Sequence, residues 1–519
     1  MRRLSSVDAQ FLAIEDGRTH SHVCQLTILE NTTVDGDPVT AALIADQIAA
    51  RIDELSPFRW RVREVPFGLD YPVFVEDHSF DIDSHVWETA LPAPGTAAQL
   101  SEAVGQIASR PLDRARPLWE IHVIHGVEDG RVAMLTKLHH AAIDGVSGIE
   151  LLSALLEPTP RPLPREVVAD EKGPVGHDPG DLELLARAFA ALPMQPIRMM
   201  RALPATLRHI DQLPTMRNLP GTELLSAAAD RAARIATRNR DGRTLERPTV
   251  SRAPKTSFGG RISPHRRFAY GTLPLTTVRA VKDALPGATV NDIVVALCAG
   301  ALRRRMAARG DDPNTALVAM VPVSVRTKDP AQGNTYGNQI SSMIVTIPTD
   351  EPDARARLER TGHVMRSAKE RHRAIPAQLL RDANHTVPPA LFGRTARMIS
   401  ATTGAGWIRP PFNVTISNIP GSPKPLYCAG ARVVSQHPVN VLIEGVGLSL
   451  TLLSYEDQLD FAFTADRELV PDVWQLVAEM RTELDLLARE VGVADQGAVP
   501  ASPTASPSTA PITTSSANA

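Results

Sequence analysis

A proline- and arginine-rich stretch, residues 159–265, interrupts the chain of 519 residues and separates two regions of alternating helical and strand-like patterns. Four prolines at positions 158, 160, 162 and 164 end the first region, because proline breaks regular backbone hydrogen bonding. A chain of this length also exceeds what one ordinary core supports. The sequence therefore predicts a first α/β unit at 1–158, a helical linker at 159–265, a second α/β unit at 266–490 and a disordered Ser/Thr/Pro tail at 491–519.

Composition narrows the classes of protein to consider. With 43% hydrophobic and 22% charged residues the chain is typical of a globular protein. Its net charge of -3 argues against a general nucleic-acid binder, which is usually basic. The three cysteines, Cys24, Cys298 and Cys428, lie far apart, so we expect a reducing compartment with neither a disulfide framework nor a zinc site.

The N-terminus has two arginines but no apolar segment after them, and acidic residues begin at Asp8. This is not the pattern of a signal peptide. No stretch approaches the roughly 18 apolar residues of a membrane span. We therefore expect a cytoplasmic protein whose contact with a membrane or lipid inclusion is peripheral. Residues 231–267 carry eleven Lys or Arg against two acids, which favours a solvated linker, with binding of CoA phosphates or of an anionic lipid surface as the two functional alternatives.

The residues best suited to chemistry lie at 131–148. A β-rich run ends in His139 and His140, and Asp144 and Gly145 follow at a turn. Adjacent side chains on a strand point to opposite faces, so the two histidines are predicted to have different roles. Histidine suits a general base because its ordinary pKa is near 6.5. A metal site is an alternative, because His-His-x-x-x-Asp holds three potential ligands, but no second cluster accompanies it and we predict no metal.

The pattern His-His-x-x-x-Asp-Gly resembles the signature of the CoA-dependent acyltransferase superfamily. Its surroundings resemble one branch, the bacterial wax ester synthase/diacylglycerol acyltransferase family. The matching segments follow one another in order: Leu4–Leu12, Phe80–Val86, Pro111–Glu120, Ile262–Arg267, Asn291-Asp292, Val321–Arg326, Gly337–Gln339 and Asn413–Gly421.

The resemblance implies two similar chloramphenicol-acetyltransferase-like halves, each a mixed sheet flanked by helices, with a channel between them. It implies acyl transfer from acyl-CoA to diacylglycerol or a fatty alcohol, with acyl-CoA as a substrate and no cofactor. His140 would be the general base, while His139 is expected to be structural and Asp144 to orient the loop. Asn291, Ser417 and Asn418 are candidates for binding substrate or stabilising an oxyanion; for Asn291 a helix N-cap is an equal alternative, and the two roles do not exclude each other.

Other functions remain open on the sequence alone. A wax ester synthase that prefers a fatty alcohol would carry the same motifs. A stand-alone condensation-type acyltransferase shares the histidine motif, although no carrier-protein region accompanies it. A non-catalytic lipid-binding relative would be expected to lose the histidine that this chain retains. The sequence does not rank the two acceptor alcohols.

Overall fold

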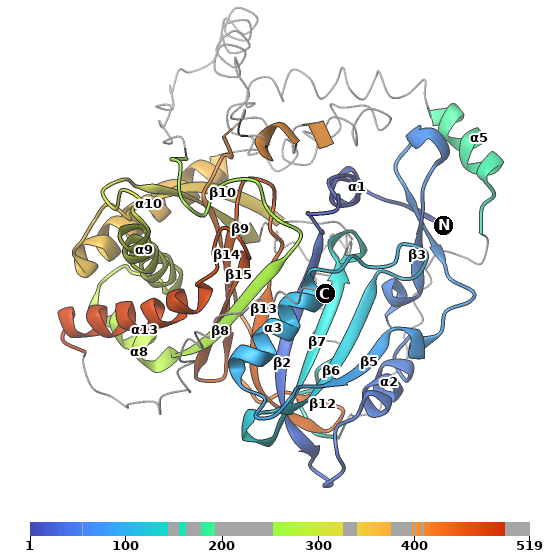
Figure 1. The fold of residues 1–519 in the computed structure, drawn as a ribbon, viewed down its shortest axis with the longest axis horizontal. Coiled ribbons are helices and arrows are strands. Elements are labelled where there is room, and N and C mark those ends of the chain that lie inside the picture. The colour runs from blue at the N-terminus through green and yellow to red at the C-terminus, as the bar shows by residue number, and fades with distance from the viewer. Residues whose placement is uncertain are drawn as a thin grey trace, which may run out of the picture.

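The computed structural model describes residues 1–53, 55–143, 155–161, 178–191, 253–324, 340–374, 397–398, 401–404, 406 and 409–493. The described residues form two six-stranded mixed sheets and a smaller three-stranded sheet. Figure 1 shows the two large sheets side by side, with a layer of helices on the outer side of the second sheet and one helix of the first half where the two halves meet. The predicted linker lies mostly outside the described residues, as does the tail beyond Val493. The sequence pattern of residues 148–156 predicts a helix, of which only the last two residues are described.

The first large sheet has the strand order β12-β13-β2-β7-β6-β5. Helix α2 covers one face and α3 the other, because alternate residues of β2 and β7 are apolar on both sides. The small sheet, β1-β4-β3, lies beside α1 and α5. The elements are β1 (Arg2–Arg3), α1 (Ser6–Ala13), β2 (His22–Thr33), α2 (Ala41–Ala49), β3 (Trp60–Arg63), β4 (Val73–Glu76), β5 (Val86–Ala90), α3 (Ala97–Ala108), β6 (Trp119–Val127), β7 (Arg131–His139) and α5 (Asp181–Ala191).

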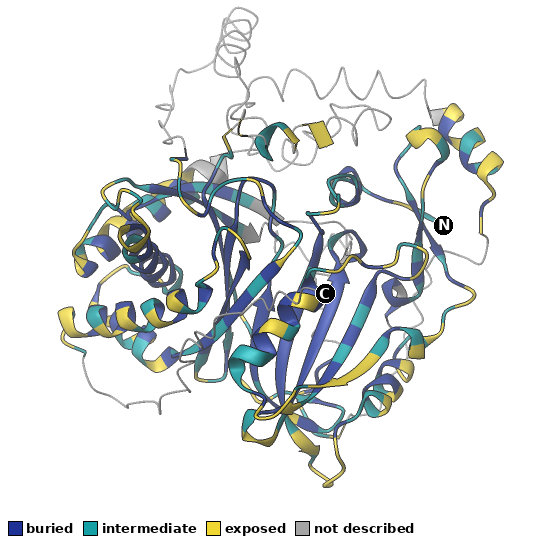
Figure 2. Cartoon of the chain, in the orientation of Figure 1, coloured by how far each residue is buried: buried dark blue, intermediate teal, exposed yellow. Residues whose placement is uncertain are grey.

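The second large sheet has the order β10-β9-β11-β14-β15-β8. Four helices pack on one of its faces and form the largest core of the molecule, visible as the dark interior of Figure 2. Its elements are β8 (Arg266–Pro274), α8 (Leu275–Ala284), α9 (Val290–Arg309), β9 (Leu317–Ser324), β10 (Ile340–Ile347), α10 (Ala354–Ala374), β11 (Val414–Ile419), β14 (Leu448–Tyr455), β15 (Gln458–Asp466) and α13 (Val473–Glu490).

Several local sequence patterns correspond to described elements. The β-rich runs at 119–124 and 131–138, with Asp129-Gly130 between them, predict a hairpin, and β6 and β7 form it, with Asp129 and Gly130 at positive φ, as an Asp-Gly turn requires. The runs 447–454 and 459–463 predict a strand pair, and β14 and β15 pair antiparallel; the strand-like runs 317–325 and 340–347 are β9 and β10, which also pair antiparallel. The helix that the sequence predicts at 290–306 is α9, and its N-cap is Thr289, which exchanges capping hydrogen bonds with Asp292. Asn291 therefore does not cap this helix, which was one of the two roles considered for it.

The C-terminal half contributes two strands to the first sheet. Strands β12 (Tyr427–Cys428) and β13 (Ala431–Val439) come from the C-terminal part of the chain, yet β13 pairs with β2 in the first sheet. Figure 1 shows β13 between β2 and the second sheet. The predicted division at residue 266 does not anticipate this crossover, because strand pairing over about 400 residues leaves no local signal in the sequence.

Candidate active site

His139 is the last residue of β7, and His140 begins a short 3₁₀ turn. The backbone N–H of His140 donates to the carbonyl of Ser21 at 2.8 Å, and that of His139 donates to the carbonyl of Leu118 at 2.9 Å. The sequence argument placed both histidines on the strand. Only His139 is there, but the two side chains do have different surroundings, as predicted.

His139 is held in one tautomer by two partners. Its Nδ1 accepts the backbone N–H of Ala141 at 3.0 Å, so the proton of the neutral ring sits on Nε2. This Nε2 lies 3.0 Å from Oε1 of Glu15. Its side chain is buried, its Nδ1 accepts from the turn, and its Nε2 faces the Glu15 carboxylate without a hydrogen bond among the described residues, so His139 holds the turn that follows the strand.

Glu15 extends this network to two further parts of the chain. Its Oε1 accepts the N–H of Ser21 at 2.8 Å, and its Oε2 lies 2.7 Å from Nη2 of Arg114. Burial raises the pKa of Glu15, but the interaction with His139 and the hydrogen bonds from Arg114 and the Ser21 N–H outweigh it and hold the pKa well below its usual range. The carboxylate is therefore ionised at neutral pH and joins the start of the chain to the histidine turn.

His140 has a contrasting environment. Its ring stacks on Phe11 of α1, with centroids 3.8 Å apart and planes inclined by 15°. Burial, and then the neighbouring His139, lower the pKa of His140 to about 4, while its own backbone carbonyl acts in the opposite sense. The ring is thus neutral at pH 7. Within the described residues, its buried Nδ1 has no hydrogen-bond partner.

The remaining predicted site residues are not brought together with the histidines by any described contact. Asp144 and Gly145 lie outside the described residues. Asn291 is in the first turn of α9. Ser417 and Asn418 are neighbours on β11 and therefore point to opposite faces of the second sheet. No hydrogen bond or ion pair in the described part of the chain joins any of these three to His139 or His140.

Four contributors to the site had no role assigned from the sequence: Phe11, Glu15, Ser21 and Arg114. Phe11 and Arg114 lie within the motifs that carry the resemblance, so their position was the available signal. Glu15 and Ser21 gave no such signal. Trp119, expected to be a packing residue, is 2% exposed and donates from its indole Nε1 to the carbonyl of Phe58 at 2.9 Å, which confirms that expectation.

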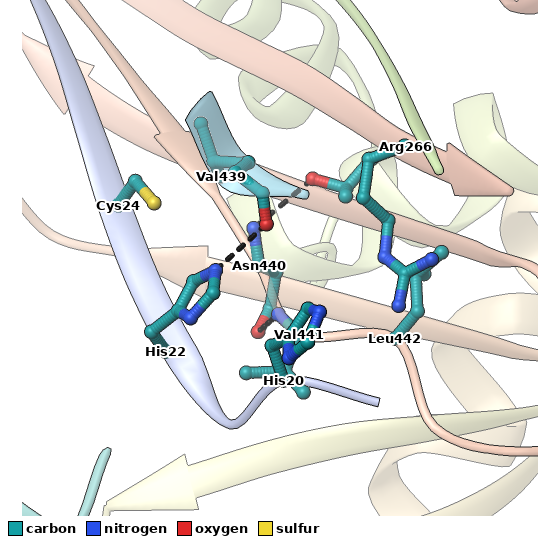
Figure 3. A pocket seen from close by; sticks show the side chains of 10 residues that line it. His20, His22, Cys24, Arg266, Val439, Asn440, Val441 and Leu442 are labelled. Atoms are coloured by element: carbon teal, nitrogen blue, oxygen red, sulfur yellow. Dashed lines mark hydrogen bonds between the residues drawn. The ribbon is translucent and has the colours of Figure 1, made fainter. Parts of the chain in front are cut away.

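A small pocket lies on the face of the first sheet that faces α3 (Figure 3). His22 pairs with His139 across β2 and β7, and its Nε2 donates to the carbonyl of Ala108 at 2.7 Å. Arg266 of the second half closes the other side, where its backbone N–H donates to Ser109 Oγ at 2.8 Å. The pocket is lined by residues of both halves and lies where they meet. It has room for about one water molecule, so it does not accommodate a lipid.

Within the described ranges, no three His, Cys, Asp or Glu side chains gather as metal ligands would. Asp144 is not among the residues described, so the prediction that no metal is needed stays a prediction. The three cysteines are buried and unbonded to one another. No helix among the described residues is both long and apolar enough to cross a membrane.

Two mixed sheets, the first completed by strands from the C-terminal half, with paired histidines where a central strand ends, define the chloramphenicol-acetyltransferase-like class of acyltransferases. Within it, residues 4–294 match the wax ester synthase/diacylglycerol acyltransferase catalytic domain, and residues 336–488 match the C-terminal domain of the same family. The chain belongs to the wax ester synthase/diacylglycerol acyltransferase family, as its sequence motifs predicted.

Individual proteins agree with this assignment. A protein of Mycobacterium tuberculosis (strain H37Rv), provisionally named a diacylglycerol O-acyltransferase, is 34% identical over 91% of this chain and 88% of its own length. The wax ester synthase/diacylglycerol acyltransferase from Marinobacter aquaeolei VT8 superposes with a TM-score of 0.65 at 28% identity, covering 95% of this chain and all of that one. The first condensation domain of the CDA synthetase shares the fold at 14% identity, with a TM-score of 0.50 and coverage of 94% and 96%.

Proposed function

We propose that this enzyme transfers a long-chain acyl group from acyl-CoA to the hydroxyl of diacylglycerol, giving triacylglycerol, and that it also accepts fatty alcohols to give wax esters. Family membership supports the reaction class. The observation that carries the mechanism is the state of His140, a neutral imidazole at the end of a central strand, beside His139, whose Nδ1 accepts a backbone N–H and whose Nε2 faces Glu15.

The thioester of acyl-CoA is already activated, so the protein need not supply a covalent nucleophile. His140 takes the proton of the acceptor hydroxyl as its oxygen attacks the thioester carbonyl. Since Nδ1 is enclosed, we assign this step to Nε2. The tetrahedral intermediate then collapses, the C–S bond breaks, and the same proton passes to the departing CoA thiolate. Each turnover leaves His140 neutral again, and no cofactor enters the proton balance.

The lowered pKa of His140 acts on both proton transfers. The ring is neutral and able to accept a proton at pH 7, although it is a weaker base than an ordinary imidazole, and the buried imidazolium gives its proton up readily to the thiolate. Phe11 restricts the ring by stacking, and Glu15, through His139 and Ser21, fixes the backbone on both sides of it. Peripheral association with a lipid surface, where both the acceptor and the product accumulate, belongs to the same proposal.

The test is an assay of purified protein with radiolabelled palmitoyl-CoA and, in separate reactions, dioleoylglycerol and hexadecanol dispersed in neutral vesicles. We expect labelled triacylglycerol and labelled wax ester, with no loss of either after chelator treatment. Absence of both products, with the thioester left intact, would contradict the proposed function. A loss after chelation that added metal restores would contradict the role of His140 as an unassisted base.

A further inference from the structure

Beside the catalytic histidine, the first sheet carries a line of polar side chains on one face. Ser21 and His140 are opposite each other, joined by the 2.8 Å backbone hydrogen bond. Four residues after Ser21 on β2 and four residues before His140 on β7, Gln25 is paired with Thr136. Side chains an even number of residues apart share a face of a strand, so Ser21 and Gln25 lie together on β2 and its approach. Thr136 lies on the same face of β7 as Leu138, whose side chain packs in the core away from α3.

These polar groups are buried but unsatisfied. Ser21 and Thr136 are 0% exposed and Gln25 is 6% exposed. In the part of the chain that the structure describes, Ser21 Oγ, Gln25 Nε2 and Thr136 Oγ1 have no hydrogen-bond partner. Native proteins rarely leave such groups unpaired unless a ligand or water completes them. The amide Nε2 only donates, so whatever completes this site must carry a hydrogen-bond acceptor.

The second half presents a similar group toward the first. Leu453 and Tyr455 of β14 pack into the core of the first half. Ser449 has the same parity on that strand, is 1% exposed, and its Oγ likewise lacks a partner among the described residues. Unsatisfied polar groups therefore occur on faces of both sheets that meet this core.

The spacing on the first sheet matches one class of acceptor. Four residues of strand separate the Gln25–Thr136 pair from the Ser21–His140 pair by about 13 Å. In a diacylglycerol, six covalent bonds separate the reacting hydroxyl oxygen from the carbonyl oxygen of its outer ester. With a hydrogen bond at each end, that extended span is also about 13 Å. A fatty alcohol has only methylene groups at this distance and would leave the donors unpaired.

We infer that Ser21, Gln25 and Thr136 form a subsite for the ester carbonyls of an acylglycerol, so that this enzyme is built for diacylglycerol in preference to a fatty alcohol. The inference rests on the proposed function, and it names the acceptor that the active site favours. A site whose buried donors need a substrate acceptor discriminates strongly against an analogue that lacks it. Gln25 and Thr136 are specificity residues in this account, because they contact the acceptor away from the reacting atoms.

The experiment compares the wild type with the double variant Gln25→Met/Thr136→Val, which keeps side-chain volume and removes the polar atoms. kcat/KM is measured for dioctanoylglycerol and for hexadecanol with the same acyl-CoA, together with the melting temperature. We expect the diacylglycerol-to-alcohol ratio of kcat/KM to fall at least tenfold in the variant. The melting temperature should stay level or rise, because unpaired buried polar groups are replaced by apolar ones of equal size. Cys24→Ala, a buried truncation next to Gln25 on the opposite face, is the matched control and should leave the ratio unchanged.

Three results would overturn the inference. One is an unchanged ratio in the double variant, which would mean that water alone completes these groups. Another is an equal shift of the ratio in Cys24→Ala, which would show a general effect of altering β2. The last is a wild type that acylates hexadecanol but not the diacylglycerol, which leaves acyl transfer intact while removing the acceptor preference. Failure of the proposed function is distinct, because neither acceptor would then be acylated by any protein in the set.

Discussion

The two faces of the first sheet differ in how their polar groups are satisfied. On the face toward α3, the fully buried Lys137 donates from Nζ to the carbonyls of Ile107 and Arg110 at 3.2 and 2.7 Å. His139 Nε2 and His22 Nδ1 on this face have no hydrogen bond among the described residues, but His139 Nε2 lies 3.0 Å from the Glu15 carboxylate. On the face with Gln25 and Thr136, both members of a cross-strand pair have a buried polar atom without a partner among the described residues. The buried charge of Lys137 is thus matched within the protein, whereas the neutral polar groups beside the reactive histidine are available to a substrate.

The largest expected effect is on the reactive histidine itself. His140→Ala removes the proposed base, so we expect kcat to fall by roughly 10²- to 10⁴-fold, with the melting temperature within a few degrees of wild type. Triacylglycerol formation and thermal unfolding measure the two quantities. His139→Ala should show the larger fall in melting temperature, because it releases Glu15 and Ala141. If His139→Ala lost activity while His140→Ala kept it, the assignment of roles would be reversed.

Glu15 contacts the surroundings of both histidines. Its Oε1 lies 3.0 Å from Nε2 of His139 and accepts the backbone N–H of Ser21, the residue opposite His140. As a positioning residue it should act on kcat. We expect Glu15→Gln to lower kcat about tenfold with little change in KM for acyl-CoA, because a misplaced base costs turnover more than binding. Glu64→Gln is the matched control, since Glu64 pairs with the same Arg114 at 3.1 Å but is exposed. Equal effects of the two variants would show that Arg114, and not the link to His139, matters.

A third variant tests the face of the first sheet toward α3. Lys137→Met removes the ammonium group and leaves the carbonyls of Ile107 and Arg110 without their donor. We expect the free energy of unfolding to fall by about 1–3 kcal/mol, measured by denaturant titration, while the diacylglycerol-to-alcohol ratio stays constant. Lys282→Met, on the surface of α8, should change stability by less than about 0.5 kcal/mol. A changed acceptor ratio in Lys137→Met would break the distinction between the two faces.

The smallest effects come from pH. The pKa of His140 is lowered to about 4, so the acid limb of kcat/KM should have its midpoint near that value and well below 6.5. Burial lowers the pKa of His437 to about 3, and this shift makes the stability of the fold depend on pH. Between about pH 6.5 and the folded value, the unfolded chain binds more protons than the folded one, so stability is lost as pH falls through this window. Melting curves from pH 8 to 5 check this, and His437→Gln should flatten the slope.

Much of the architecture was predictable because its signals are local. The Asp129-Gly130 turn, the runs that became β9 and β10, and the apolar face of α13 each follow from propensity or periodicity within a few residues. The histidine motif and its ordered companions were sufficient to predict the family. The N-cap of α9 was missed because Thr289 and Asn291 are both good capping residues, and only the backbone of the folded helix shows which one accepts the hydrogen bond.

The surroundings of the histidines, unlike these local elements, depend on contacts between distant parts of the chain. The sequence by itself determined the two α/β regions, the paired histidines and the family, because these depend on short patterns along the chain. The tertiary structure alone decided that β13 joins the first sheet, that Glu15 and Arg114 lock His139 while Phe11 stacks on His140, and that Gln25 lies across from Thr136 with no partner for its Nε2 among the described residues. These arrangements bring together residues separated by roughly 100 to 400 positions. Burial and pairing at that range are properties of the packed fold, for which no local pattern in the chain exists.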